Sequence, residues 1–335
     1  MIRSLTFVPL LALIACGGKD SDDTGGTGDN GGDSGSDSCE VTVPSTIPSS
    51  GATNANYRSN IEFHLSAADA TATIDAGGIA GTQMVSSDGK TVYWQLSGPL
   101  EPLTSYTVTL NYCGGSVPLS FTTSNVGTPT TTSLVGNPYA IDLAAANIVE
   151  PPGIGSVLGA YLTTNILLGV MSASGTDMQM LGALAIEGGT TQDYCSPSID
   201  FPPADWQDPY FQIGPQDTNF AVAGYDIAVQ DLNITGSFAP DGSYVDGATL
   251  SGTIDTRPLA GLVDDSGNEG AICELAVNFG ATCEACPSDD GMYCLTLVAN
   301  QISADKVSGA LVVVAGSDCE GCESGPPAED AVCAG

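Results

Sequence analysis

The sequence contains very few basic residues. Lys and Arg together number 6 among 335 residues, against 39 Asp and Glu, and the formal net charge is −33 at pH 7. Nucleic-acid binding needs a basic surface, so the composition excludes nucleic acid as a partner. The same shortage of positive charge argues against recognition of anionic lipid headgroups.

Histidine is rarer still, since His64 is the only one in the chain. A zinc site of the HExxH kind needs two histidines. A Ser-His-Asp triad would have to use His64, and no nucleophile-elbow motif accompanies it. His64 also falls on the polar phase of an alternating run. We therefore interpret it as a surface residue without a catalytic role.

The residues that are abundant indicate many short strands joined by turns. Hydrophobic residues make up 42% of the chain, which also has 42 Gly and 20 Pro but only 13% charged residues. This composition favours an all-β protein with real hydrophobic cores over a disordered or helical one. At roughly 100–200 residues per domain, the length predicts two folded domains.

The N-terminus has the pattern of a targeting segment. Arg3 precedes an apolar run over 5–13 that is too short to span a bilayer, so residues 1–15 are predicted to be a signal peptide. The four residues 13–16, Leu-Ile-Ala-Cys, resemble the lipobox of bacterial lipoproteins. The resemblance implies cleavage before Cys16 and its acylation with diacylglycerol and a further chain such as palmitate. Gly17 after it implies an outer-membrane location, with exposure at the cell surface as one option.

Residues 16–38 are predicted to be a tether. The run 17–38 holds 8 Gly and 6 Asp in 22 residues and no apolar side chain, so it lacks the material for a core. The tether partly matches the calcium-binding loop of an EF-hand at Asp20, Asp22 and Gly25. Position 12 of that loop, however, would be Gly31 instead of Glu. A solvated spacer is the preferred interpretation and calcium binding the alternative.

Four stretches between residues 60 and 122 alternate between apolar and polar side chains, which predicts half-buried strands of a β-sandwich. The apolar positions are Ile61, Phe63 and Leu65; Val92, Trp94 and Leu96; Tyr106, Val108, Leu110 and Tyr112; and Leu119 and Phe121.

Residues 42–124 also resemble the bacterial Ig-like domain, within a predicted domain at 39–128. The shared elements are residues 48–51, the strand at 60–65, the turn Asp88-Gly89-Lys90, the segment 100–106 and the closing Phe121-Thr122-Thr123. The resemblance implies a spacer or adhesive module and no enzymatic activity. Cys39 and Cys113 depart from the family pattern, and we expect them to form a disulfide that ties the first strand to a late one.

The remainder, 133–335, is predicted to be a larger β-rich domain, a sandwich or a barrel, with one or two short helices. Expected strands are 182–186, 220–224, 227–238, 248–254, 293–299 and 307–315, and expected helices are 258–263 and 270–280. A bulge is expected near Asp231 and a hairpin turn at Asp241-Gly242. The apolar segment 153–172 is interpreted as buried strands or one buried helix, with a membrane-spanning helix as the alternative.

Ten cysteines follow Cys16, and disulfides are expected because the predicted compartment is extracytoplasmic. They are Cys39, Cys113, Cys195, Cys273, Cys283, Cys286, Cys294, Cys319, Cys322 and Cys333. The connectivity among the last eight is left open. The two CxxC pairs, at 283–286 and 319–322, could alternatively bind zinc.

Asp200, Asp205 and Asp208, with Trp206 beside them, form the best local candidate for a ligand site. Such a loop suits calcium or a sugar, and a carboxylate-pair hydrolase is the less favoured reading. The sequence thus predicts a non-catalytic, lipid-anchored envelope protein without a cofactor, whose partners are a surface glycan or protein. A calcium- or carbohydrate-binding module is the alternative.

Overall fold

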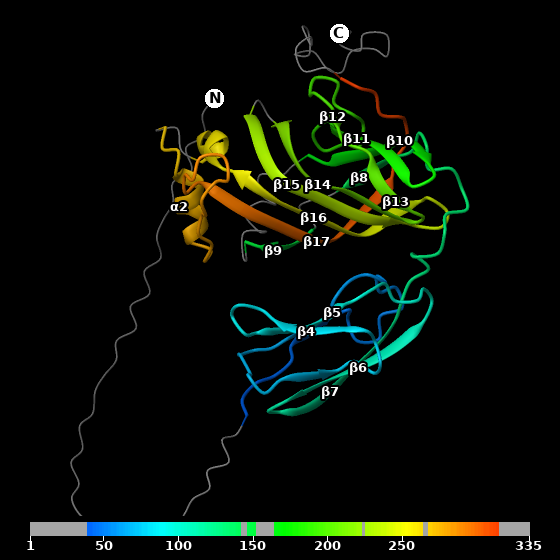
Figure 1. Ribbon diagram of the computed structural model, residues 1–335, viewed down its shortest axis with the longest axis vertical. Coiled ribbons are helices and arrows are strands. Elements are labelled where there is room, and N and C mark those ends of the chain that lie inside the picture. The colour runs from blue at the N-terminus through cyan, green and yellow to red at the C-terminus, as the bar shows by residue number, and fades with distance from the viewer. Residues whose placement is uncertain (1–38, 142–145, 152–163, 223–224, 264–266, 315–335) are drawn as a thin grey trace, which may run out of the picture. The chain divides into compact units, whose positions relative to one another are not determined.

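The computed structural model describes residues 39–141, 146–151, 164–222, 225–263 and 267–314 (Figure 1). From Glu40 onward these residues belong to one compact unit. Strands dominate the described chain, and its helical segments are short, which confirms the all-β class. Its two largest hydrophobic clusters are the cores of an N-terminal sandwich, residues 40–126, and a C-terminal barrel, residues 138–314.

The sandwich consists of a four-stranded and a three-stranded antiparallel sheet. The first sheet has the order β1-β2-β5-β4, with β1 at Ser45–Ile47, β2 at Ile61–His64, β5 at Thr91–Leu96 and β4 at Gly81–Val85. The second has the order β3-β6-β7, with β3 at Thr73–Asp75, β6 at Ser105–Tyr112 and β7 at Gly115–Thr122. The four alternating runs of the sequence therefore lie on β2, β5, β6 and β7.

Alternation places one face of each sheet in the core of the sandwich. Ile61 and Phe63 are fully buried on β2, while the residues between and after them are half-buried. Val108 and Leu110 of β6 close the core from the opposite sheet. A period of two thus gave the correct buried face, because antiparallel sheets of a sandwich bury one face and leave the other in contact with water.

The barrel is a closed antiparallel sheet. Its strands follow the path β10-β8-β17-β16-β15-β14-β13-β11, and a pairing between β11 and β10 closes the path. The strands are β8 Pro138–Ile141, β10 Ile166–Ser174, β11 Asp177–Leu184, β13 Ala204–Gln207, β14 Tyr210–Val222, β15 Tyr225–Phe238, β16 Tyr244–Asp255 and β17 Cys294–Lys306. Two short strands, β9 Asn147–Glu150 and β12 Ile199–Asp200, pair with β17 and β11 from outside this path.

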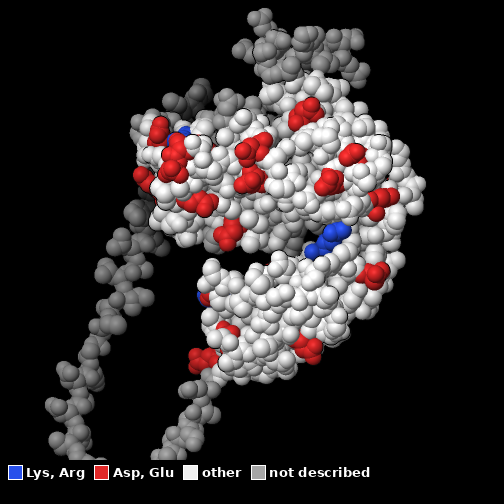
Figure 2. Space-filling view, viewed as in Figure 1, with Lys and Arg blue, Asp and Glu red and all other residues white. Residues whose placement is uncertain are grey.

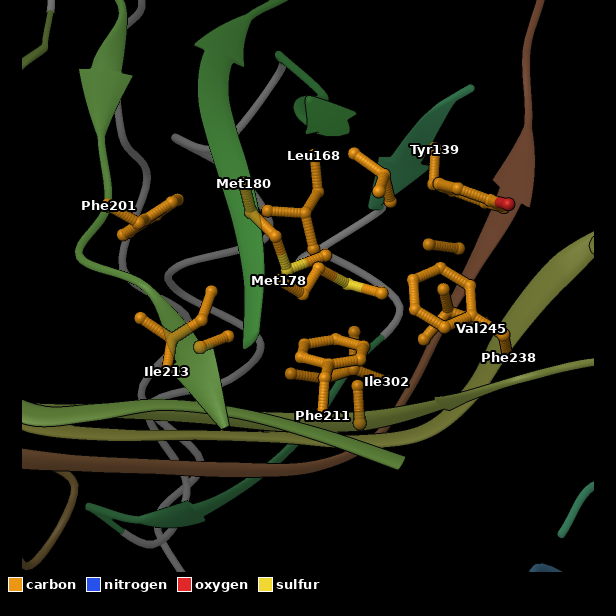
Figure 3. Close-up of a cluster of buried hydrophobic side chains, with 14 of the residues drawn as sticks. Tyr139, Leu168, Met178, Met180, Phe201, Phe211, Ile213, Phe238, Val245 and Ile302 are labelled. Atoms are coloured by element: carbon orange, nitrogen blue, oxygen red, sulfur yellow. The ribbon is translucent and has the colours of Figure 1, made fainter. Parts of the chain in front are cut away.

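Aromatic and sulfur-containing side chains fill the barrel. Figure 3 shows Phe211, Phe238, Met178 and Met180 converging in its interior. The ring of Phe238 lies 5.2 Å from those of Tyr139 and Phe211 and 5.8 Å from that of Trp206, between ring centroids. Burial raises the pKa of Tyr139 to about 12, and its hydroxyl donates to the carbonyl of Gly242 at 3.0 Å.

Several local features of the barrel match the sequence expectations. The register between β15 and β16 shifts between Gln230 and Asn233, and Asp231 has a φ of 50°, so the bulge near Asp231 is confirmed. The turn at Asp241-Gly242 joins β15 to β16, with φ of 68° at Gly242. The short helices are also confirmed, as η2 at Arg257–Leu262 and α2 at Ala271–Val277.

The expected strand at 307–315 is wrong for its described part, because the chain leaves the sheet after Lys306. Leu311 and Val314 are buried, as their apolar character suggested. The backbone of Val312, however, bonds to the side-chain amide of Gln192, at 2.8 and 2.9 Å. A buried amide thus takes the place of a partner strand, which the apolar pattern alone could not reveal.

The apolar segment 153–172 is described only from residue 164 onward, where it continues as β10. This part is a buried strand, in agreement with the preferred interpretation. In the described part of the chain, no helix has the length and apolar character needed to cross a membrane.

Candidate functional site

Side chains of the sandwich are bound to the outer surface of the barrel at one junction. Tyr57 is 4% exposed, and its hydroxyl lies 2.9 Å from the Ser237 Oγ on β15, which is 2% exposed. The Arg58 Nε also donates to the Tyr57 hydroxyl at 3.2 Å. Because a guanidinium can only donate, the Tyr57 oxygen accepts from Arg58 and its proton is free to reach Ser237.

Arg58 makes a second contact across the junction. Its guanidinium carbon lies 3.8 Å from the centroid of the Tyr210 ring on β14 and 5.4 Å from that of Tyr57. A cation over an aromatic face at this distance is attracted by the ring quadrupole, by about 0.5–1 kcal/mol where water has access. Asn56 adds a longer contact, with its Nδ2 3.5 Å from the Asp246 Oδ2.

The Thr-rich segment that joins the two domains is also fixed to the barrel. The Thr130 amide donates to the Asp208 carboxylate at 2.8 Å. Thr131 donates from both its amide and its hydroxyl to the Pro240 carbonyl, and the Thr132 hydroxyl donates to the Asp241 carbonyl. Together with Tyr57 and Arg58, this segment forms a clamp that couples the sandwich to the barrel.

Beside the clamp lies a groove with a volume of about 290 Å³. Its walls are polar, and Arg58 and Glu62 are the charged residues among those that line it. From the sandwich it is lined by Arg58, Asn60 and Glu62, and from the barrel by Tyr210, Thr249 and Gln301, among others. Burial raises the pKa of Glu62, and His64, whose Nε2 lies 3.5 Å from the Glu62 Oε2, partly offsets this rise.

The positive charge of Arg58 stands out against an acidic surface. Figure 2 shows Asp and Glu scattered over the visible face and Lys and Arg at only a few points. Among the described residues, Arg257 pairs with Asp255 and Asp289, whereas Arg58 has no carboxylate within 4.0 Å. Its Nη groups thus keep free hydrogen-bonding capacity on a residue that lines the groove.

The residues predicted for a ligand site have separate surroundings. Trp206 is half-buried and packs its ring against Phe238 at the edge of the core. The Asp208 carboxylate accepts from Thr130 in the clamp, and that of Asp200 accepts from Gln179. Asp200 and Asp205 pair with Leu181 and Asp177 of β11, four residues apart. Their backbone positions are therefore about 13 Å apart along β11. The two carboxylates of a glycosidase lie about 5–9.5 Å apart.

Disulfides occupy all seven described cysteines. Cys273 is bonded to Cys283 and Cys286 to Cys294, which braces the segment 256–294 between β16 and β17. Cys39, Cys113 and Cys195 are disulfide-bonded as well. The first CxxC pair is therefore not a zinc site. Cys319, Cys322 and Cys333 lie outside the described residues, as do Cys16 and the tether residues weighed for calcium.

One group of described side chains has the spacing of metal ligands, namely Asp255, Cys286 and Cys294. The two cysteines are bonded to each other, so neither can offer a thiolate. The Asp255 carboxylate is engaged by Arg257. This group therefore has no ligand set for a metal ion.

Replacing Tyr57 with phenylalanine is expected to lower the free energy of unfolding by about 1–2 kcal/mol, because the buried Ser237 loses its partner across the clamp. Urea unfolding followed by tryptophan fluorescence measures the change. Tyr106→Phe is the matched control, since the Tyr106 hydroxyl accepts from the Glu101 amide in an exposed place within the sandwich. Equal losses in the two variants would contradict a role for the clamp.

Arg257 is expected to make stability depend on pH. Hydrogen bonds from Arg257 hold the pKa of Asp255 and of Asp289 below the ordinary value of 3.8. The two ion pairs therefore stabilise the fold above about pH 4, and this stabilisation is lost as the pH falls through the folded-state pKa values. Thermal melts of the wild type and Arg257→Gln should differ at pH 6 and converge at low pH. A difference that is constant with pH would contradict this account.

None of the clamp residues was predicted as functional from the sequence. The scarcity of basic residues was the one available signal, because it makes each lone Arg of a folded domain notable. Nothing in the local sequence around Tyr57 or Ser237, however, indicates that residues 180 positions apart share a buried hydrogen bond.

Comparisons with known proteins give one family match, and it is confined to the sandwich. No curated protein matches the chain. One solved structure with some similarity is the crystal structure of the S-layer protein rSbsC(31-844), at 10% identity and a TM-score of 0.19. That alignment covers 82% of this chain and 54% of the S-layer chain, so this chain spans about half its length. A TM-score this low carries no argument about fold or function. Residues 37–123 match the family of the bacterial Ig-like domain, so the sandwich is a domain of this kind.

Proposed function

We propose that the protein is a non-catalytic, lipid-anchored component of the bacterial outer membrane, in which the Ig-like domain is a fixed spacer that presents the barrel for contact. The observation that carries this proposal is the clamp, which fixes the Ig-like domain to the barrel. A freely hinged spacer would need no buried hydrogen bond to the next domain, whereas Tyr57 and Ser237 share one. The clamped linker residues support the same conclusion.

The order of the parts along the chain supports a role in display. A lipobox-like Cys16, a tether without apolar side chains, an Ig-like domain and a disulfide-braced barrel follow one another. The tether is rich in Asp, so repulsion between like charges would extend it. An acidic surface poor in Lys would keep the two domains soluble outside the cell.

Membrane anchoring is tested by replacing Cys16 with alanine in the full chain. We expect the wild type in the membrane fraction, and in the detergent phase on phase separation, and Cys16→Ala in the soluble fraction. Ser36→Ala, in the same tether, is the control and should behave as the wild type. A Cys16→Ala protein that stays with the membrane would overturn lipid anchoring.

Display on the cell surface is tested by labelling intact cells with a membrane-impermeant amine reagent. Lys90 of the Ig-like domain and Lys306 of the barrel are exposed and provide one reactive amine each. Labelling of both in intact cells is expected for a protein that faces the medium. Labelling that needs broken cells would overturn surface display and place the domains in the periplasm.

A further inference from the structure

We propose that the groove beside the clamp binds a segment of an acidic polysaccharide, with Arg58 holding a sugar carboxylate. This inference rests on the described groove and does not depend on the lipid anchor. It places a ligand site at residues that differ from the Asp200–Asp208 loop of the sequence prediction.

Arg58 is the residue that would bind the negatively charged group of the ligand. Its Nε is engaged by Tyr57, and its guanidinium is held over the Tyr210 ring, so its position is fixed. Neither Nη group donates to a described residue, and no carboxylate of the described residues lies within 4.0 Å of the guanidinium. A fixed guanidinium with free Nη groups matches a carboxylate, which it can bind through two parallel hydrogen bonds.

The remaining walls match sugar hydroxyls. Asn60 lies on the sandwich side, and a bulge in β17 brings Asn300 and Gln301 to the barrel side. Thr249 lines the same side. Side-chain amides and hydroxyls both donate and accept, and Glu62 accepts, which is the capacity that a ring of hydroxyl groups requires.

Charge and size favour a ligand with widely spaced negative charges over a polyphosphate. A nucleotide or another polyphosphate carries several negative charges, and the groove offers one guanidinium against one glutamate. A volume of about 290 Å³ is at the lower limit of the range of roughly 300–1,000 Å³ that is typical of ligand clefts. An acidic polysaccharide carries only about one carboxylate per sugar, so the groove can take a short piece of it with a single carboxylate at Arg58.

The test measures binding of polygalacturonate to the full mature chain by calorimetry, with a chelator present and dextran as the neutral probe. We expect heat with polygalacturonate and none with dextran. Arg58→Gln should weaken binding about tenfold or more, since a hydrogen-bonded charge pair is lost. Lys90→Gln is the matched control, because it removes the same charge from an exposed turn of the same domain and should bind as the wild type.

Two further variants keep the clamp intact. Asn60→Asp should weaken binding by placing a second negative charge in the groove, and Glu62→Gln should strengthen it by removing one. Equal affinity of wild type and Arg58→Gln, equal binding of dextran, or no binding of polygalacturonate would each overturn the proposal. Stronger binding by Asn60→Asp, or weaker binding by Glu62→Gln, would also overturn it. Neither result of the Cys16→Ala test affects these binding measurements, so the two proposals fail separately.

Discussion

Replacing Phe238 with alanine is expected to lower the free energy of unfolding by about 3–5 kcal/mol, near the upper end for a single core residue. Phe238 is fully buried, and three aromatic rings surround it at 5.2–5.8 Å between centroids. These neighbours come from β8, β13 and β14, which belong to a closed sheet. A closed sheet has little freedom to collapse around a lost ring, so most of the cavity should remain.

Urea unfolding in the absence of reductant measures this effect, with the disulfides intact in every variant. Phe238→Leu should cost much less, about 1–1.5 kcal/mol, because it keeps most of the volume. Met84→Ala, at a side chain that is 40% exposed on β4, is the surface control and should change stability by under about 1 kcal/mol. A Phe238→Ala protein within about 1 kcal/mol of the wild type would show that this cluster is not the core of the barrel.

The strands of the sandwich could be predicted from the sequence because each buries one face. On β2 the burial of Ile61 and Phe63 follows the apolar phase residue by residue. β10 is different, since Leu167 and Leu168 are adjacent and both are buried, each in its own cluster. A strand covered on both faces reads as a continuous apolar run, which a buried helix also produces, so the sequence left both options open.

The groove could not be predicted, because its walls come from distant parts of the chain. Arg58 and Glu62 lie on the Ig-like domain, whereas Thr249 and Gln301 lie on β16 and β17. No local pattern brings such positions together. The Asp200–Asp208 site was predicted from local clustering of acidic residues, and the structure places its carboxylates on β12, on β13 and in the turn that follows β13. Its Trp206 faces Phe238 because β13 is a barrel strand and not a loop.

Removing both disulfides of the segment 256–294 is expected to open that segment while the barrel stays folded. The bridges span 10 and 8 residues in sequence, and closing such short loops is worth about 2.5 kcal/mol each in the chain-entropy description. The segment packs through a small core, in which its Ala276 and Ala281 contact Leu295 of β17. So small a core cannot offset the loss of about 5 kcal/mol of stabilisation by the two disulfides. Local unfolding of the segment should therefore become frequent.

A glutamate-specific protease detects this opening, because Glu274 and Glu284 lie within the segment and are exposed. The fourfold variant with alanine at Cys273, Cys283, Cys286 and Cys294 should be cleaved there much faster than the wild type under non-reducing conditions. The two double variants should be intermediate. Cys286→Ala/Cys294→Ala should be the more sensitive of the two, because these residues are buried at 0 and 1% exposure and their disulfide also bonds the segment to the first residue of β17. Cleavage at the wild-type rate in the fourfold variant would mean that packing of η2 against β15 and the Arg257 ion pairs, and not the disulfides, hold the segment on the barrel.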